Sequence, residues 1–152
     1  MNDYDTDYVQ PGKAGGGAVT VAFPNLRGTL TVRVLVACVA IYVAQALLDL
    51  LGIWPQQNSY SLLGLSRAGL SRGMLWQPVT SPFLHFGVMH LLFNMLALAF
   101  LGVDVERRLG KGRYLLFSAA CALGGSVGFL LLDRPRAIAV GYSGVNFGLM
   151  AA

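Results

Sequence analysis

Residues 83–102 read FLHFGVMHLLFNMLALAFLG. This stretch carries no formal charge and is dominated by large apolar side chains, which is typical of a membrane-spanning helix. Three polar side chains nevertheless lie within it: His85, His90 and Asn94. A polar group in hydrocarbon costs free energy unless it has a partner. The stretch therefore predicts either a polar bridge between helices or a functional site, and by itself it leaves both open.

Composition extends this interpretation to the whole chain. Of the 152 residues, 55% are hydrophobic and 12% are charged, which is too few charges for an ordinary soluble domain. We expect membrane spans at 30–51, 83–103 and 114–132, and a fourth apolar segment that begins near Tyr142. That segment has eleven residues up to Ala152, about 16 Å of helix or half a crossing. We therefore expect the chain to be truncated within its fourth helix.

The remaining segments predict domains and topology. Residues 1–27 predict a flexible tail, and residues 28–152 predict a membrane domain that is incomplete at its C-terminus. Segment 104–113 holds four basic residues, which predicts a cytoplasmic connection and a cytoplasmic N-terminus. The connection 53–82 is rich in Trp, Tyr and Pro and is expected at the opposite interface. The net charge is +4, and the basic residues lie at the ends of the apolar segments and not along one face. We therefore expect no nucleic-acid partner.

A second polar feature is Gly141-Tyr142-Ser143-Gly144, where a serine begins the fourth apolar segment. At a helix N-terminus, unpaired backbone N–H groups and the helix dipole favour negative charge. A serine hydroxyl there is placed to attack a carbonyl while those N–H groups stabilise the oxyanion. Gly141, Gly144 and Gly148 would let a helix or a substrate backbone approach closely. Gly-x-Ser-Gly alone is weak evidence, because small residues are common where membrane helices touch.

The spacing of the polar residues in the second span indicates which of them share a helix face. His90 and Asn94 stand at i and i+4, so they share one helix face, and both can donate a hydrogen bond to an oxyanion. His85 would lie about 140° around the same helix, so we expect it not to share their ligand. A two-histidine metal or haem site is the competing interpretation, but it needs further ligands that the spacing does not supply. We expect no metal and no organic cofactor.

Taken in order, these motifs resemble the rhomboid family of intramembrane serine proteases. The resemblance is carried by residues 76–80 (WQPVT), 83–95 (FLHFGVMHLLFNM), 102–110 (GVDVERRLG) and 141–150 (GYSGVNFGLM). It implies an all-α membrane protein, a polytopic helical bundle with three full transmembrane helices and the start of a fourth in this chain. It also implies a multi-pass protein of a bacterial plasma membrane. Its partners would be the lipid bilayer and the transmembrane protein substrates that it cleaves.

The resemblance also implies roles for particular residues. Ser143 matches the family's nucleophile, and His90 and Asn94 match side chains that stabilise the oxyanion. Gly141 and Phe147 match positions expected to bind substrate. Phe147 also lies one turn after Ser143, where the family carries an aromatic or apolar residue against which its catalytic histidine packs.

Three further matches are expected to be structural. His85 matches a residue regarded as holding the long first connection, and Glu106 and Arg108 match a fold-stabilising Glu-x-Arg pattern. The family's Trp-Arg pair is replaced by Trp76-Gln77. We expect this departure to have a small effect, because an exposed ion pair in a loop contributes only about 0–1 kcal/mol.

A second departure concerns the general base. In the family this base is a histidine two helices after the serine, whereas the chain holds only His85 and His90. General-base catalysis typically contributes about 10²–10⁴-fold, so we expect this chain alone to be inactive. The alternative function is a catalytically inactive rhomboid-like protein that binds membrane clients. A transporter or channel fragment fits the hydropathy but leaves the ordered motifs unexplained.

Overall fold

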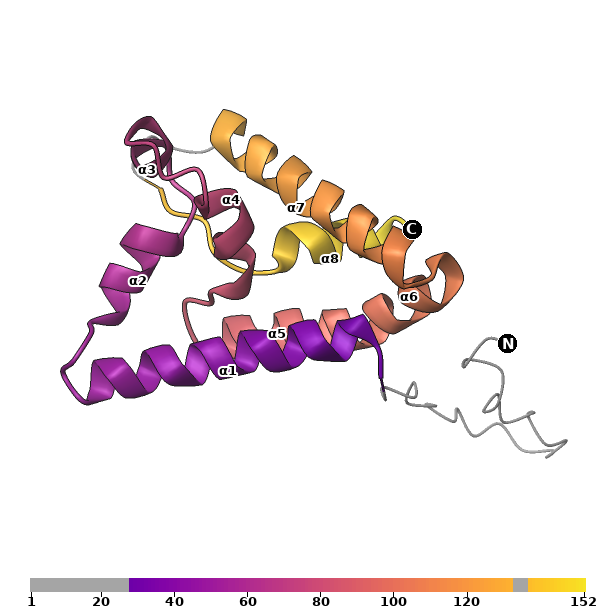
Figure 1. Cartoon of the computed structure of the whole chain (residues 1–152), viewed down its shortest axis with the longest axis horizontal. Coiled ribbons are helices and arrows are strands. Elements are labelled where there is room, and N and C mark those ends of the chain that lie inside the picture. Colours follow the sequence, from indigo (N-terminus) through magenta and orange to yellow (C-terminus); the bar gives the residue numbers. More distant parts are fainter. Residues whose placement is uncertain (1–27, 133–136) are drawn as a thin grey trace, which may run out of the picture.

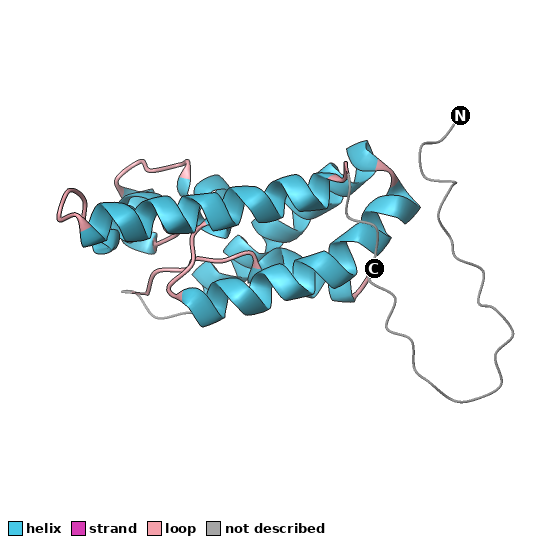
Figure 2. Cartoon of the chain, turned by 90° about the horizontal axis from the view of Figure 1, so that it is seen from below, coloured by secondary structure: helices cyan, strands magenta, loops and turns pink. Residues whose placement is uncertain are grey.

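The computed structural model describes residues 28–132 and 137–152, so the expected tail at 1–27 and the loop 133–136 lie outside the described residues. Three described helical segments are long and apolar enough to cross a membrane: Leu30–Leu50, Val88–Leu109 and Lys111–Leu132. The long helices run side by side rather than end to end (Figures 1 and 2). The predicted all-α membrane bundle is confirmed for this part of the chain.

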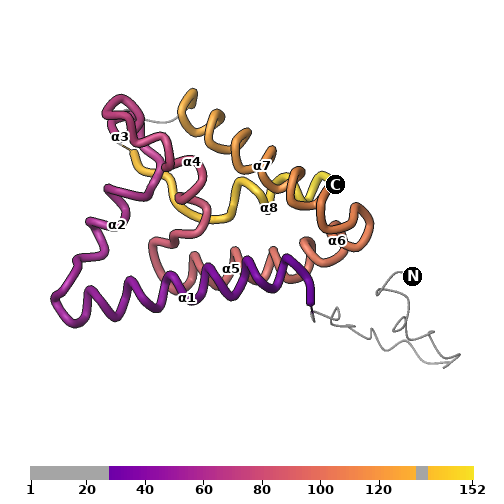
Figure 3. The backbone as a smooth tube through the Cα atoms, viewed as in Figure 1, coloured from indigo at the N-terminus to yellow at the C-terminus, as the bar shows by residue number. Residues whose placement is uncertain are grey.

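The helices follow one another with short connections. In chain order they are α1 (Leu30–Leu50), α2 (Gln56–Leu63), α3 (Arg67–Ser71), α4 (Gln77–Thr80), η1 (Ser81–Phe83), α5 (Val88–Ala97), η2 (Leu98–Gly102), α6 (Val103–Leu109), α7 (Lys111–Leu132) and α8 (Ser143–Met150). The backbone tube shows α8 entering beside α4 and running along α7 (Figure 3). The first span is thus close to its predicted bounds, and α8 begins beside Tyr142 as expected.

The second span differs from its prediction at both ends. Its helix begins at Val88, after an extended Gly87, and not at Phe83, which closes the short η1 helix. At the other end α5, η2 and α6 form one helical rod that continues to Leu109. The predicted connection 104–113 is therefore mostly helix, since Glu, Arg, Lys and Leu are good helix formers. The chain turns at Gly110, whose φ of 77° suits glycine.

Glu106 joins the start of α1 to α6. Its side chain is 0% exposed, and its two oxygens accept hydrogen bonds from Leu30 N (2.8 Å), Thr31 N (2.9 Å) and Thr31 Oγ (2.8 Å). The hydroxyl of Tyr114 on α7 lies 3.1 Å from Thr31 Oγ. A carboxylate at a helix N-terminus pairs with N–H groups that otherwise lack a partner in the helix. These contacts support the fold-stabilising role expected for Glu106.

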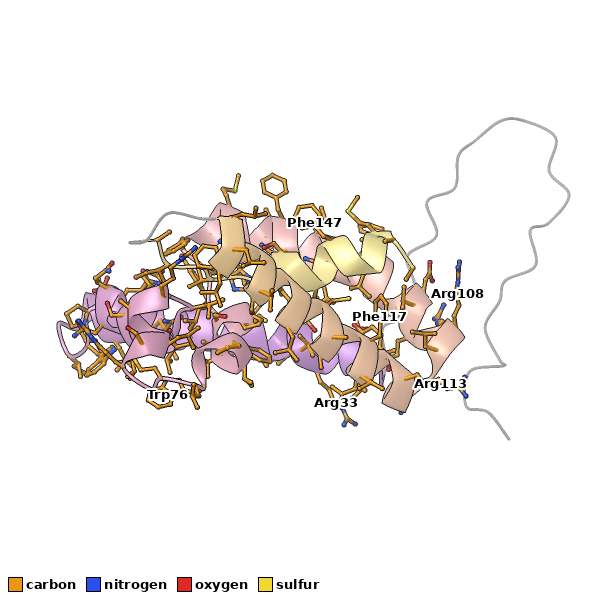
Figure 4. The ribbon with its side chains drawn as sticks, turned by 90° about the horizontal axis from the view of Figure 1, so that it is seen from above. Arg33, Trp76, Arg108, Arg113, Phe117 and Phe147 are labelled. Atoms are coloured by element: carbon orange, nitrogen blue, oxygen red, sulfur yellow. The ribbon has the colours of Figure 1, made fainter. Side chains whose placement is uncertain are left out.

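Arg108, expected to assist Glu106, has a different setting. It is exposed on α6, and neither a hydrogen bond nor an ion pair joins it to any residue in the described ranges. Arg108 and Arg113 lie at the α6–α7 end of the molecule, far from Trp76 (Figure 4). The stabilising role expected for Arg108 therefore stays a prediction.

The Gln77 side chain is buried inside the connection between α1 and α5 and hydrogen-bonds to its backbone. It is 0% exposed; its Oε1 accepts a hydrogen bond from Ser66 N (3.1 Å), and its Nε2 donates to Ser61 O (3.3 Å) and Leu62 O (3.4 Å). Gly69 packs directly against its carboxamide. The expectation of an exposed loop position was wrong, because the short helices α2–α4 fold around this side chain. The amide binds the backbone of the connection without any charge.

Small residues let α8 approach α7 closely. A Cβ placed at Gly125 would lie 3.2 Å from the Cα of Gly144, and one placed at Gly148 would overlap Cys121 Sγ. Such close approach favours packing between membrane helices. The predicted function of Gly144 and Gly148 as points of close helix contact is confirmed.

Candidate active site

Two backbone attachments set the position of Ser143. Leu65 and Ala139 exchange hydrogen bonds of 2.9 and 2.8 Å, and Gly141 N donates to Ser81 O at 3.0 Å. These contacts fasten the segment before α8 to the connection between α1 and α5. Helix α8 then begins at Ser143, and no described side chain caps its N-terminus. Its first backbone N–H groups are therefore left without a side-chain acceptor.

Gly141 lies against both residues expected to stabilise an oxyanion. A Cβ at this position would lie 2.7 Å from His90 Cε1, 2.8 Å from His90 Nε2 and 3.8 Å from Asn94 Nδ2. Its φ of 110° is also a conformation that residues with a side chain rarely adopt. Glycine is thus required here twice, by backbone conformation and by space. The fold brings His90, Asn94 and the backbone two residues before Ser143 together.

The hydrogen bond made by His90 Nδ1 sets which ring nitrogen carries the proton. Phe86 N donates to Nδ1 at 3.4 Å, so in the neutral ring the proton resides on Nε2. Nε2 and its neighbour Cε1 are the ring atoms that lie beside Gly141. The Phe86 and His90 rings stack with centroids 6.3 Å apart, which further restricts the imidazole. His90 therefore presents an N–H donor, and not an acceptor, toward the segment that leads into Ser143.

The carboxamide of Asn94 is held on both sides. Its Nδ2 donates to His90 O at 2.8 Å, as the predicted shared helix face allows. Its Oδ1 accepts from Asn146 Nδ2 at 3.2 Å. Asn146 was not among the residues predicted to be functional. An Asn three residues after the serine of an apolar helix was the signal that would have found it, because a buried amide needs a partner.

His85 lies nearer to His90 than its spacing predicted. The segment from Leu84 to Gly87 is not helical, and the two imidazole rings meet edge to face with centroids 5.2 Å apart. The prediction of 140° of helical separation was wrong, because the helix begins only at Val88. Tyr60 OH donates to the His85 carbonyl at 2.9 Å, so this residue joins the long connection to the site. Burial, together with the nearby His90, lowers the pKa of His85 to about 4, which keeps it neutral at physiological pH.

A cavity of about 480 Å³ adjoins this cluster. Ser143, Gly141 and Phe147 all line it, together with parts of α7 and of the connection before α5. Phe147 is 71% exposed, and Figure 4 shows its ring projecting from α8. His90 and Asn94 meet the cavity wall through Gly141. The predicted nucleophile Ser143 therefore lines the cavity, and the two predicted donors lie on the far side of Gly141 from it.

The competing metal site has no support in the described ranges, where no three His, Cys, Asp or Glu side chains gather around one point. His85 and His90 are the two histidines of the chain, and His90 Nδ1 already accepts a hydrogen bond. The arrangement can supply a serine hydroxyl, a helix N-terminus and two side-chain N–H donors. This set of groups suits acyl transfer through a tetrahedral oxyanion.

Comparison with known proteins identifies the family of the chain. The family model of the rhomboid domain matches residues 72–152. The rhomboid protease GlpG of Yersinia enterocolitica is 33% identical over 129 residues, which cover 80% of this chain and 38% of that protein. The GlpG proteins of Yersinia pestis and Yersinia pseudotuberculosis are each 30% identical over 126 residues, with the same coverage. The chain belongs to the rhomboid family. It spans well under half the length of these relatives.

Proposed function

We propose that this chain is the nucleophile-bearing part of an intramembrane serine protease that cleaves peptide bonds in or near transmembrane segments of other membrane proteins. The observation that carries the proposal is the contact of Gly141 with His90 Nε2 and Asn94 Nδ2 beside the cavity that Ser143 lines. Membership of a family whose relatives include GlpG rhomboid proteases supports it. A client-binding protein without activity would not need these donors beside a serine.

In this mechanism Ser143 attacks the scissile carbonyl of a substrate segment that enters the cavity. The segment must be unwound, because a helical carbonyl is already hydrogen-bonded and shielded. The Ser143 N–H, His90 Nε2–H and Asn94 Nδ2–H receive the oxyanion of the tetrahedral intermediate, and loss of one such donor typically costs about 10²–10³ in rate. Gly141 and Phe147 contact the substrate at the cavity wall.

Proton transfer is assigned to a histidine that this chain does not contain. His90 does not fit that role, because its Nδ1 is occupied by Phe86 N and its Nε2 bears the proton that the oxyanion needs. The incoming histidine accepts the Ser143 proton, passes it to the leaving amine and then activates the water that releases the acyl-enzyme. No metal or organic cofactor takes part.

The proposed orientation places the α6–α7 end in the cytoplasm of a bacterium and the cavity toward the other side of the plasma membrane. The basic residues Arg108 and Arg113 lie together at that end (Figure 4), as the positive-inside rule expects of a cytoplasmic end. Labelling of single cysteines from either side of intact cells tests this orientation. A cysteine at Lys111 should react only after the membrane is opened.

The function is tested with the full natural protein in membranes. Ser143→Ala should abolish cleavage of a transmembrane substrate and covalent labelling by a fluorophosphonate, because the nucleophile is lost. Ser118→Ala is a matched control, since Ser118 is a buried serine of α7 that does not line the cavity. Cleavage that survives Ser143→Ala, or a wild-type protein without Ser143-dependent cleavage, would overturn the proposal and favour a client-binding role.

A further inference from the structure

Asn146 lies on α8 three residues after Ser143 and reaches across to α5. Its side chain is 6% exposed, and its Nδ2 donates to two atoms of one residue, Asn94 O at 3.1 Å and Asn94 Oδ1 at 3.2 Å. The helix that carries the nucleophile is thereby bonded to the helix that carries the oxyanion donors. The wide π-helical turn η2 begins directly after this point, at Leu98, whose N–H also bonds to Asn94 O.

The network determines which way both amides face. Asn94 Nδ2 lies against His90 O, which is an acceptor, so the amide nitrogen of Asn94 must be on that side. Its Oδ1 is then directed to α8, where it and Asn94 O form a pair of acceptors. Asn146 can satisfy both only through its Nδ2. Neither amide can therefore flip without placing acceptor against acceptor.

This orientation matters for the proposed chemistry. The same Asn94 Nδ2 is the atom nearest Gly141 after His90, and one of its two hydrogens remains after the bond to His90 O. If Asn94 flipped, its Oδ1 would face the developing oxyanion and repel it. A donor in the wrong place is worth little, because stabilisation depends on donors that are oriented before the reaction.

We propose that Asn146 is a positioning residue that holds the Asn94 carboxamide with its N–H toward the oxyanion. The inference rests on the proposed protease function. Packing alone does not account for Asn146, because its own Oδ1 is buried without a partner among the described residues. An unpaired buried oxygen costs stability that a leucine of similar size would not lose. The donor on Nδ2 is what the amide supplies and leucine lacks.

The test is a double-mutant cycle in the full natural protein, with kcat and KM measured for a transmembrane substrate. Asn146→Leu should lower kcat about tenfold and leave KM within about twofold, the loss expected from about 1.4 kcal/mol of hydrogen-bond energy. In an Asn94→Ala background the same change should have less than about a twofold effect, because there is no carboxamide left to orient. Asn146→Gln keeps an amide donor and should recover part of kcat.

Gln45→Leu is the matched control. Gln45 is a buried amide of α1 whose side-chain nitrogen and oxygen have no partner in the described part of the chain, and it does not line the cavity. The kcat of Gln45→Leu should equal that of the wild type. Should Asn146→Leu fail to fold, Asn146→Ala has the same expected split. An unchanged kcat, or an equal loss with Asn94 removed, overturns the inference while leaving the protease function intact. If the wild-type protein shows no Ser143-dependent cleavage, both the Asn146 inference and the proposed protease function are overturned.

Discussion

Buried polar groups at the two ends of the bundle are satisfied to different degrees. At the α1–α6 end, the Glu106 carboxylate receives three hydrogen bonds from the first turn of α1. At the α5–α8 end, Phe86 N bonds to the His90 ring, and the His90 carbonyl and Asn146 bond to the Asn94 carboxamide. His90 Nε2 lies beside Gly141, which has no side chain. In the first arrangement every carboxylate oxygen has a partner, and we expect it to stabilise the fold. The second keeps N–H donors oriented and available, as a site that stabilises developing charge requires.

Loss of the Glu106 carboxylate at the α1–α6 end should destabilise the protein strongly. Glu106→Ala should lower the free energy of unfolding by about 3–5 kcal/mol, because three donors lose their acceptor and each costs about 1–3 kcal/mol when buried. Denaturation of the protein in mixed micelles measures this. Asp104→Ala on the same helix is the control, since Asp104 is exposed. Equal stability of the two variants would show that the Glu106 contacts do not hold α1.

The next effect separates activity from stability at the α5–α8 end. Gly141→Ala should reduce the cleavage rate by about 10²–10³, because the added Cβ displaces the His90 and Asn94 donors. Gly73→Ala is a matched control: Gly73 also has a positive φ, of 84°, but has open space around it. Both variants incur backbone strain of about 1–2 kcal/mol. A similar rate loss in both would attribute the effect to strain instead of to the donors.

A smaller effect is expected in the connection that carries the segment before α8. Gln77→Ala should cost about 1–3 kcal/mol of unfolding free energy, since the half-buried Ser66 N loses its acceptor and the fully buried Gln77 side chain is removed. Gln57→Ala on the exposed face of α2 should change stability by less than about 0.5 kcal/mol. The two variants are compared by thermal denaturation followed by limited proteolysis. A stable Gln77→Ala would mean that the connection is held elsewhere.

Arg108 lies near Glu106 on α6 but should contribute little to stability. Arg108→Ala should change the unfolding free energy by no more than about 0.5 kcal/mol, because Arg108 is exposed and makes no hydrogen bond or ion pair within the described ranges. The same micelle denaturation checks this. A loss above about 1 kcal/mol would restore the structural role that the motif resemblance assigns to Arg108.

The places where sequence prediction failed share a cause. Hydropathy placed His85 on the same helix as His90, but the chain is not helical between Phe83 and Val88, and the two rings come into contact. Charge placed residues 104–109 in a loop, yet the helix continues through them. Gln77 was read as an exposed position and is fully buried. Each error came from inferring local environment from composition, which reports preference for lipid or water but not which neighbour lies alongside.

Three features could be predicted from the amino-acid sequence: the number and approximate place of the long membrane helices, the serine at the start of α8, and the shared helix face of His90 and Asn94. These follow from local periodicity and from the cost of placing polar groups in hydrocarbon. The packed fold was needed to see that Gly141 lies against both donors and that Asn146 holds Asn94. Those contacts join segments up to 52 residues apart. Long-range packing creates these two contacts, whereas the hydrogen bond from Phe86 N to His90 Nδ1 spans four residues and forms because the chain before Val88 is not helical.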